Sequence, residues 1–175
     1  MSMQTMRYVG FLILLLPYDV SAQTCRTEMQ IPSSTPTERF VENGDGTVTD
    51  NDTGLMWMKC SLGQSDPDCS GGSVAAYTWK EALDIADSYT FAGYSDWRIP
   101  NVKELRTIVE QRCYYPSVNL AIFPETPNSF YWTSSAADFD SSGPVWSVSF
   151  DHGFEAIAFT RVDPRKVRLV RNRSF

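Results

Sequence analysis

Four cysteines are the side chains of this sequence best suited to covalent chemistry, and we expect all of them to form disulfides. Cys60 and Cys69 are nine positions apart, across a loop of Gly, Ser, Asp and Pro that can fold back on itself. Four cysteines allow three pairings, but this spacing favours Cys60–Cys69 and leaves Cys25 to pair with Cys113, at the end of a helix. The sequence has no Cys-x-x-Cys motif and a single histidine, His152, so it does not predict a zinc site.

One turn partly matches a calcium-binding loop of the EF-hand type. Asn43, Asp45, Gly46 and Asp52 would occupy its third, fifth, sixth and twelfth places. Val41 in the first place has no side-chain oxygen, and the twelfth place lacks the usual bidentate Glu. Because calcium takes at least about six oxygen ligands, we expect a plain turn here and no cofactor.

A nucleophilic set can be drawn from His152, Asp151 and either Ser147 or Ser149. Such a set needs a carboxylate that orients the imidazole while the imidazole takes the serine proton. Asp151-His152-Gly153, however, is typical of a tight hairpin turn, and a neighbour in sequence rarely orients a catalytic histidine. We therefore expect that the protein is not an enzyme.

The candidate ligand-binding residues are Tyr94, Trp97, Asp138 and Asp140, in loops that we expect to converge near a sugar site. The five tryptophans themselves are expected mainly in the core, because large aromatic side chains are highly buried on average.

The first 22 residues predict a cleaved secretory signal peptide. Arg7 gives a weakly basic start, residues 8–16 are apolar, and Val20-Ser21-Ala22 fits cleavage before Gln23. A membrane anchor is the alternative, but the apolar run has about half of the roughly 20 residues that a spanning helix needs. We expect a secreted, periplasmic or cell-surface protein with no stable membrane insertion after cleavage.

The charge is acidic overall and unevenly distributed. The formal net charge is −6, whereas residues 161–173 hold six basic side chains and one acidic one. An acidic body argues against nonspecific binding of nucleic acid. The basic segment either docks on an acidic partner or neutralises the protein's own body, which is the commoner role of surface charge. The oligomeric state stays open.

The elements that must position these residues are strands and two helices. Residues 39–59 predict a hairpin and a buried strand, and residues 130–171 predict further antiparallel strands. Between them, Thr78 with Glu81 and Asn101 with Glu104 have capping-box spacing at the starts of two helices.

The second helix is expected to run as far as Cys113, with Glu110 on its solvent face. Just before this helix, Asp96 and Arg98 flank Trp97 and are expected to pair with groups of the scaffold. The grouping of strands and helices predicts an α+β fold, an antiparallel β-sheet meander with two amphipathic helices, stabilised by disulfides. We divide the chain into a signal peptide (1–22), an N-terminal arm (23–38) and one domain (39–173).

Several stretches of the sequence, taken together and in this order, resemble one family of bacterial domains. They are Asn43-Gly-Asp-Gly-Thr-Val-Thr-Asp-Asn-Asp-Thr-Gly-Leu-Met-Trp57, Thr78-Trp-Lys-Glu-Ala-Leu83, Gly93-Tyr-Ser-Asp-Trp-Arg-Ile-Pro-Asn-Val-Lys-Glu-Leu105, and Phe123-Pro-Glu-Thr-Pro127 with Tyr131-Trp-Thr-Ser-Ser135. They resemble the Lcl C-terminal domain family over residues 39–171. The resemblance implies a fold related to C-type lectins and formylglycine-generating enzymes, in a secreted or cell-surface setting.

The namesake of that family is the tip of a collagen-like adhesin, for which the resemblance implies binding of sulfated polysaccharide by a trimer. This chain is acidic and has no Gly-X-Y repeat, so we do not expect that ligand to transfer. The resemblance favours an exported, non-catalytic binding or adhesion domain whose ligand is a glycan or a protein. The alternatives are an assembly partner of another surface or periplasmic protein and, third, an enzyme.

Overall fold

The computed structural model of the chain describes residues 22–137 and 143–173. Residues 1–21, and with them nearly all of the predicted signal peptide, lie outside this part. Among the described residues, no helix is long and apolar enough to cross a membrane. In chain order, the elements are β1 (Thr24–Cys25), a 3₁₀ helix (Thr37–Arg39), β2 (Phe40–Glu42), β3 (Thr47–Asp50), β4 (Leu55–Met58), β5 (Gln64–Ser65), β6 (Gly71–Gly72), α1 (Trp79–Ser88), α2 (Val102–Arg106), β7 (Cys113–Tyr114), β8 (Phe130–Ala136), β9 (Val145–Ser149), β10 (Phe154–Ala158) and β11 (Val170–Asn172).

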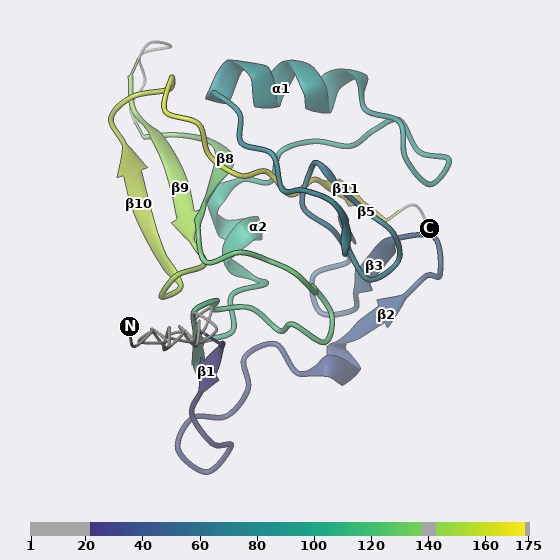
Figure 1. Ribbon diagram of the computed structural model, residues 1–175, viewed down its shortest axis with the longest axis vertical. Coiled ribbons are helices and arrows are strands. Elements are labelled where there is room, and N and C mark those ends of the chain that lie inside the picture. Colours follow the sequence, from purple (N-terminus) through teal and green to yellow (C-terminus); the bar gives the residue numbers. More distant parts are fainter. Residues whose placement is uncertain (1–21, 138–142, 174–175) are drawn as a thin grey trace, which may run out of the picture.

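The predicted α+β fold is confirmed, with its strands divided between two main antiparallel sheets. One has the strand order β11-β4-β3-β2 and the other β10-β9-β8, while β1-β7 and β5-β6 form small ribbons. Val170 of β11 lies opposite Trp57 of β4, so the end of the domain returns to its first hairpin and not to the β8–β10 meander. In Figure 1 the two main sheets lie apart, and α2 is seen between them, packed on β8 and β9.

Tryptophan side chains mark two buried clusters. One surrounds Trp57 and joins β2–β4 to α2, β8 and β9, and the other surrounds Trp97 and Trp132 and packs against α1. These three tryptophans are buried, whereas Trp79 and Trp146 are half-buried. Strand β4 contributes side chains to both clusters, because successive side chains of a strand point to opposite faces. The prediction of a tryptophan-rich core is therefore confirmed.

Both helices begin at the predicted capping boxes. The Glu81 N–H donates to Thr78 Oγ1 at 3.3 Å, while the Thr78 N–H donates to the Glu81 carboxylate at 2.8 Å. Asn101 and Glu104 exchange the same two bonds, at 2.9 and 2.8 Å. These bonds satisfy N–H groups that the first turn of a helix leaves without a partner.

The second helix is shorter than predicted, because α2 ends at Arg106 and not near Cys113. The chain continues in tight turns, in which the Val109 N–H bonds the Arg106 carbonyl at 3.1 Å. These turns keep Ile108 and Val109 in the core. They also direct Glu110 inward, so the prediction of a solvent-facing Glu110 is wrong.

Glu110 instead holds the N-terminal arm to the domain. Glu110 is 2 % exposed, and its carboxylate accepts hydrogen bonds from Ser33 Oγ at 2.5 Å and from the Thr35 N–H at 3.0 Å. The N–H groups of Ser34 and Arg112 also donate to it. Burial alone would raise the pKa of this carboxyl, but the hydrogen bonds outweigh burial and lower the pKa to about 2.

The two disulfides have the predicted pairing. Cys25 and Cys113 lie opposite each other in the β1–β7 ribbon and are bonded, so the arm is fixed to a strand and not, as predicted, to the end of a helix. The Cys60–Cys69 bridge closes the loop that contains β5. No free cysteine remains among the described residues, which include all four cysteines of the chain.

Candidate binding cleft

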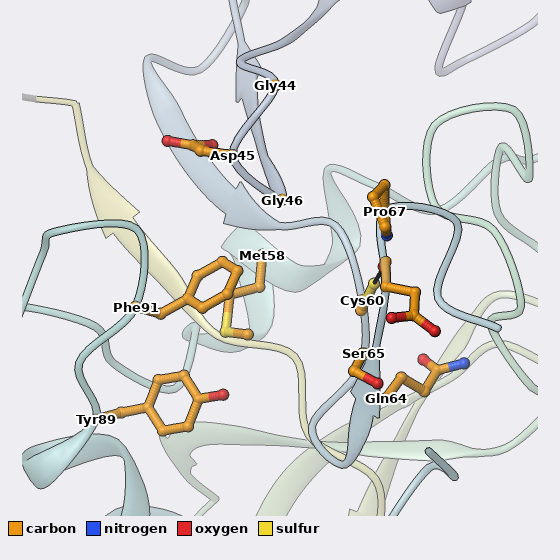
Figure 2. Close-up of a pocket in the computed structure, with 11 residues that line it drawn as sticks. Gly44, Asp45, Gly46, Met58, Cys60, Gln64, Ser65, Pro67, Tyr89 and Phe91 are labelled. Carbon is orange, nitrogen blue, oxygen red and sulfur yellow. Dashed lines mark hydrogen bonds between the residues drawn. The ribbon is translucent and has the colours of Figure 1, made fainter. Parts of the chain in front are cut away.

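A cleft of about 400 Å³ opens between the β2–β3 turn, the Cys60–Cys69 loop and the segment that follows α1. Figure 2 shows Tyr89 and Phe91 on one side of it, Gln64 and Ser65 on the other, and Met58 between them. The volume is within the range of small-molecule sites. The lining residues are Gly44, Asp45, Gly46, Met58, Cys60, Gln64, Ser65, Asp66, Pro67, Tyr89 and Phe91.

The aromatic wall of the cleft is fixed by the backbone around it. Tyr89 caps the end of α1, where its N–H bonds the Ala86 carbonyl, and its ring centroid is 6.4 Å from that of Phe91. Phe91 exchanges two backbone hydrogen bonds with Tyr94, at 3.0 and 2.9 Å. Trp97 Nε1 donates to the Phe91 carbonyl at 3.1 Å, and the centroids of these two rings are 6.2 Å apart. The wall therefore has little freedom to collapse into the cleft.

The Phe91 ring packs closely against Gly46. Gly46 has φ +85°, and a Cβ at this position would lie 2.7 Å from the ring of Phe91. Both the backbone conformation and the close approach require a residue without a side chain.

The opposite wall is held by covalent and polar contacts. Gln64 Oε1 accepts from the Ser61 N–H at 2.9 Å, and its Nε2 donates to the carbonyls of Cys69 at 3.1 Å and Glu125 at 3.0 Å. Together with the Cys60–Cys69 bridge, these bonds hold the loop in place before any ligand arrives. A wall that is ordered in advance lowers the entropy cost of binding.

Among the described residues, the lining of the cleft includes two carboxylates and no basic side chain, so it is negatively charged. Asp45 Oδ1 accepts from the N–H and hydroxyl of Thr47, at 3.0 and 2.6 Å, and Asp45 Oδ2 has no hydrogen-bond partner in the described part of the chain. Asp66 is exposed. Met58, which lies between the two walls, forms the floor of the cleft. The next residue, Lys59, is paired with Glu42 at 2.8 Å.

Tyr89 places a phenol O–H in the cleft. Burial, and to a smaller extent the neighbouring Tyr77, raises the pKa of Tyr89, so the phenol stays protonated at neutral pH. Figure 2 shows this hydroxyl directed across the cleft toward the wall that carries Ser65. It can donate a hydrogen bond to a ligand lying between the two walls.

Two of the predicted ligand residues, Tyr94 and Trp97, do not line this cleft. Trp97 is 3 % exposed, and Tyr94 lies under Arg171, whose Cζ is 3.8 Å from the centroid of the Tyr94 ring. Asp138 and Asp140 lie outside the described residues. Tyr94 and Trp97 instead support the Phe91 wall from behind.

Sequence analysis did not predict that Tyr89, Phe91 and the Cys60–Cys69 loop line a common cleft. A local signal existed, since two aromatic residues follow a polar helix end and precede Gly93. That these residues face the loop and the hairpin turn follows only from tertiary packing.

Asp96 and Arg98 pair with the scaffold, as predicted. Arg171 donates to both carboxylate oxygens of Asp96, at 2.7 and 3.1 Å, and these hydrogen bonds lower the pKa of Asp96. Arg98 binds Glu104 in the same two-point manner, at 2.7 and 2.8 Å.

Several cations of the basic segment 161–173 also bond within the protein. Lys166 Nζ donates to the Val74 carbonyl at 3.0 Å, and Arg161 Nε donates to the Gly143 carbonyl at 2.7 Å. Together with the Asp96–Arg171 pair, these contacts favour the interpretation that the basic segment interacts within the protein and does not dock on an acidic partner.

Arg168 is a buried residue of that segment, and it bonds to the backbone and side chains next to the cleft. It is 1 % exposed and donates to the carbonyls of Met58 and Lys59 and to the hydroxyls of Ser61 and Thr126. Burial lowers the pKa of this guanidinium. The contacts link the floor of the cleft to the base of the Cys60–Cys69 loop.

The residues proposed for a nucleophilic set have other partners. His152 Nδ1 lies 3.0 Å from Asp151 Oδ2, but Ser147 Oγ donates to the Ala156 carbonyl at 3.0 Å, and Ser149 Oγ accepts from the Asp151 N–H at 3.1 Å. Both serines are fully buried in the sheet. The arrangement therefore does not present a serine to His152.

The residues of the calcium pattern also have other partners. Asn43 Nδ2 donates to the hydroxyls of Thr47 and Thr49, and Asp52 lies 3.4 Å from Arg39 Nε. Within residues 22–137 and 143–173, no three His, Cys, Asp or Glu side chains gather in a group that could hold a metal ion.

Sequence comparison gives one result for the chain as a whole. The profile of the Lcl C-terminal domain matches residues 46–171, which include every part of the cleft from Gly46 to Phe91. No curated protein matches the sequence. Because the matched segment is well over half of the 175 residues, the chain belongs to the Lcl C-terminal domain family.

Proposed function

We propose that this protein is an exported, non-catalytic binding domain that holds a carbohydrate in the cleft between Tyr89, Phe91 and the Cys60–Cys69 loop. The observation that carries the proposal is a fixed pair of aromatic rings that face a polar wall. The two sides enclose a cleft of about 400 Å³. A sugar ring has an apolar C–H face and a rim of hydroxyl groups. The aromatic wall suits the face, and the opposite wall suits the rim.

The polar groups of the cleft match the needs of sugar hydroxyls. Ser65 and Tyr89 each offer a hydroxyl, while Asp45 Oδ2 offers a free acceptor. A few placed polar groups within a mostly apolar lining are typical of ligand sites that fix orientation.

Two further observations support binding without catalysis, outside the cytoplasm. All four cysteines are in disulfides, which persist in oxidising compartments and leave no thiol for covalent chemistry. The hydroxyls of Ser147 and Ser149 are committed to sheet contacts. The predicted likeness to C-type lectins stays a prediction and is consistent with this function.

The proposal is tested by titrating the ¹⁵N-labelled protein with a panel of oligosaccharides and following amide chemical shifts. We expect the shifts to concentrate at Gln64, Ser65, Tyr89 and Phe91. Phe91→Ala should weaken binding about tenfold or more, because truncation of a central aromatic contact typically costs about 2 kcal/mol.

Controls separate binding from folding. Phe159→Ala removes an aromatic side chain that is 86 % exposed and outside the cleft, and it should leave affinity unchanged. Tyr89→Ala gives a second variant of the wall, in case Phe91→Ala unfolds the segment. Unchanged affinity in both folded wall variants, or no shift with any sugar, would contradict the proposal.

A further inference from the structure

We propose that the cleft selects an amino sugar with a free amino group over neutral or sulfated sugars. This inference rests on the proposed function and assigns the charge of its ligand. It is carried by three features of one cleft: the Tyr89–Phe91 wall, the carboxylates of Asp45 and Asp66, and the lack of a basic side chain among the described residues of the lining.

The carboxylates offer acceptors that an ammonium group needs. An ammonium has three N–H donors, a positive charge and no acceptor, so it favours a lining that offers oxygen acceptors and negative charge. Thr47 holds Asp45 through Oδ1, which keeps the carboxylate in place and leaves Oδ2 for a ligand. Asp66 adds a second negative charge from the loop wall.

The aromatic wall also attracts a positively charged ligand. The face of an aromatic ring carries negative electrostatic potential and attracts a cation placed over it. Trp97 and the backbone around Phe91 hold this ring from behind, and Gly46 leaves room at its edge. A protonated amino sugar can therefore stack its C–H face on the wall while the negative charge of the lining attracts its ammonium.

A sulfated ligand meets the opposite situation. Its sulfate groups would enter a lining whose described residues include two carboxylates and no compensating cation. Lys59 follows Met58 in sequence, but its side chain is only 14 % exposed and already paired with Glu42 at 2.8 Å. Electrostatic repulsion thus disfavours anionic sugars in this cleft.

The direct test compares glucosamine oligomers, N-acetylglucosamine oligomers of equal length and a heparin oligosaccharide by calorimetry at pH 5.5 and low salt. We expect the glucosamine oligomer to bind about three- to tenfold more tightly than its N-acetylated counterpart, as one or two partly exposed ion pairs allow. The preference should shrink at high salt, which screens exposed charges.

Paired variants assign the preference to the two carboxylates. Asp45→Asn keeps the Oδ1 acceptor for Thr47, and Asp66→Asn keeps a residue that tolerates the φ of +66° at this position. The double variant should bind both oligomers equally. Asp68→Asn removes a carboxylate of the same loop that bonds Ser70 and does not line the cleft, so it should keep the preference.

The outcomes distinguish failure of the amino-sugar inference from failure of the carbohydrate function. Equal binding of both oligomers by the unmodified protein would overturn the amino-sugar inference and leave the carbohydrate function standing. Tighter binding of heparin, or a preference that survives Asp45→Asn with Asp66→Asn, would also overturn the inference. If no sugar binds while a lysine-rich peptide does, both proposals fail.

Discussion

At the scale of single residues, the shape of the cleft depends on one position without a side chain. Gly46 approaches the ring of Phe91 so closely that a Cβ would lie 2.7 Å from it. Gly44, two residues earlier in the same turn, also has a positive φ, of +81°, but nothing lies within 4 Å of its Cβ position. The two glycines therefore separate the effect of backbone strain from the effect of the contact.

We predict that Gly46→Ala and Gly44→Ala destabilise the protein by a similar amount through the backbone, about 1 kcal/mol each, because alanine resists a left-handed conformation. Only Gly46→Ala should also displace Phe91 and weaken ligand binding. Thermal unfolding and a ligand titration on both variants measure the two effects. Equal loss of affinity in the two variants would show that Gly46 has no special role at the wall.

At the scale of elements, each disulfide secures a different part of the chain. The Cys25–Cys113 bridge spans a sequence separation of 88 and fastens the arm, whereas the Cys60–Cys69 bridge spans 9 and fastens one wall of the cleft. Chain entropy predicts that the longer loop contributes more stability. Proximity to the cleft predicts that the shorter one contributes more to binding.

We predict that replacing Cys25 and Cys113 by serine lowers the free energy of unfolding by about 4–5 kcal/mol, and replacing Cys60 and Cys69 by about 3 kcal/mol. Ligand affinity should fall mainly in the second variant, because its loop wall becomes mobile. Denaturant unfolding and calorimetry on the two double variants give this comparison. A larger affinity loss in the Cys25/Cys113 variant would contradict the assignment of the wall.

At the scale of the whole molecule, Glu110 ties the arm to the domain and makes stability depend on pH. The pKa of its carboxyl is about 2 in the folded protein, lowered from the 4.5 of a freely solvated glutamate side chain. A carboxylate with a lowered pKa stabilises the folded state fully above its unfolded pKa, and this contribution is lost as the pH falls through the folded pKa.

We predict that between pH 5 and pH 2 the unmodified protein loses about 3 kcal/mol more stability than the Glu110→Gln variant, which has no carboxyl to titrate at this position. Urea unfolding across this range measures the difference. Glu38→Gln, which removes an exposed carboxylate of the same arm, serves as the control and should follow the unmodified protein. Parallel pH profiles for Glu110→Gln and the unmodified protein would refute the role of Glu110.

The sequence by itself determined the local features of this protein. Capping boxes at Thr78 and Asn101, the buried strand at residues 55–58 and the disulfide pairing all follow from neighbours in the chain or from loop length. The family, too, was recognisable from motif order, because its motifs are contiguous stretches.

Tertiary structure alone decided where distant segments meet. Beyond the early end of α2, the burial of Glu110 depends on an arm more than seventy positions away, which helical spacing cannot predict. The cleft likewise joins a hairpin turn, a cross-linked loop and a helix end. Each is a short polar or aromatic stretch whose own sequence does not specify its neighbours in space. Periodicity reports which face of an element is buried, whereas the choice of partner depends on packing across the whole chain.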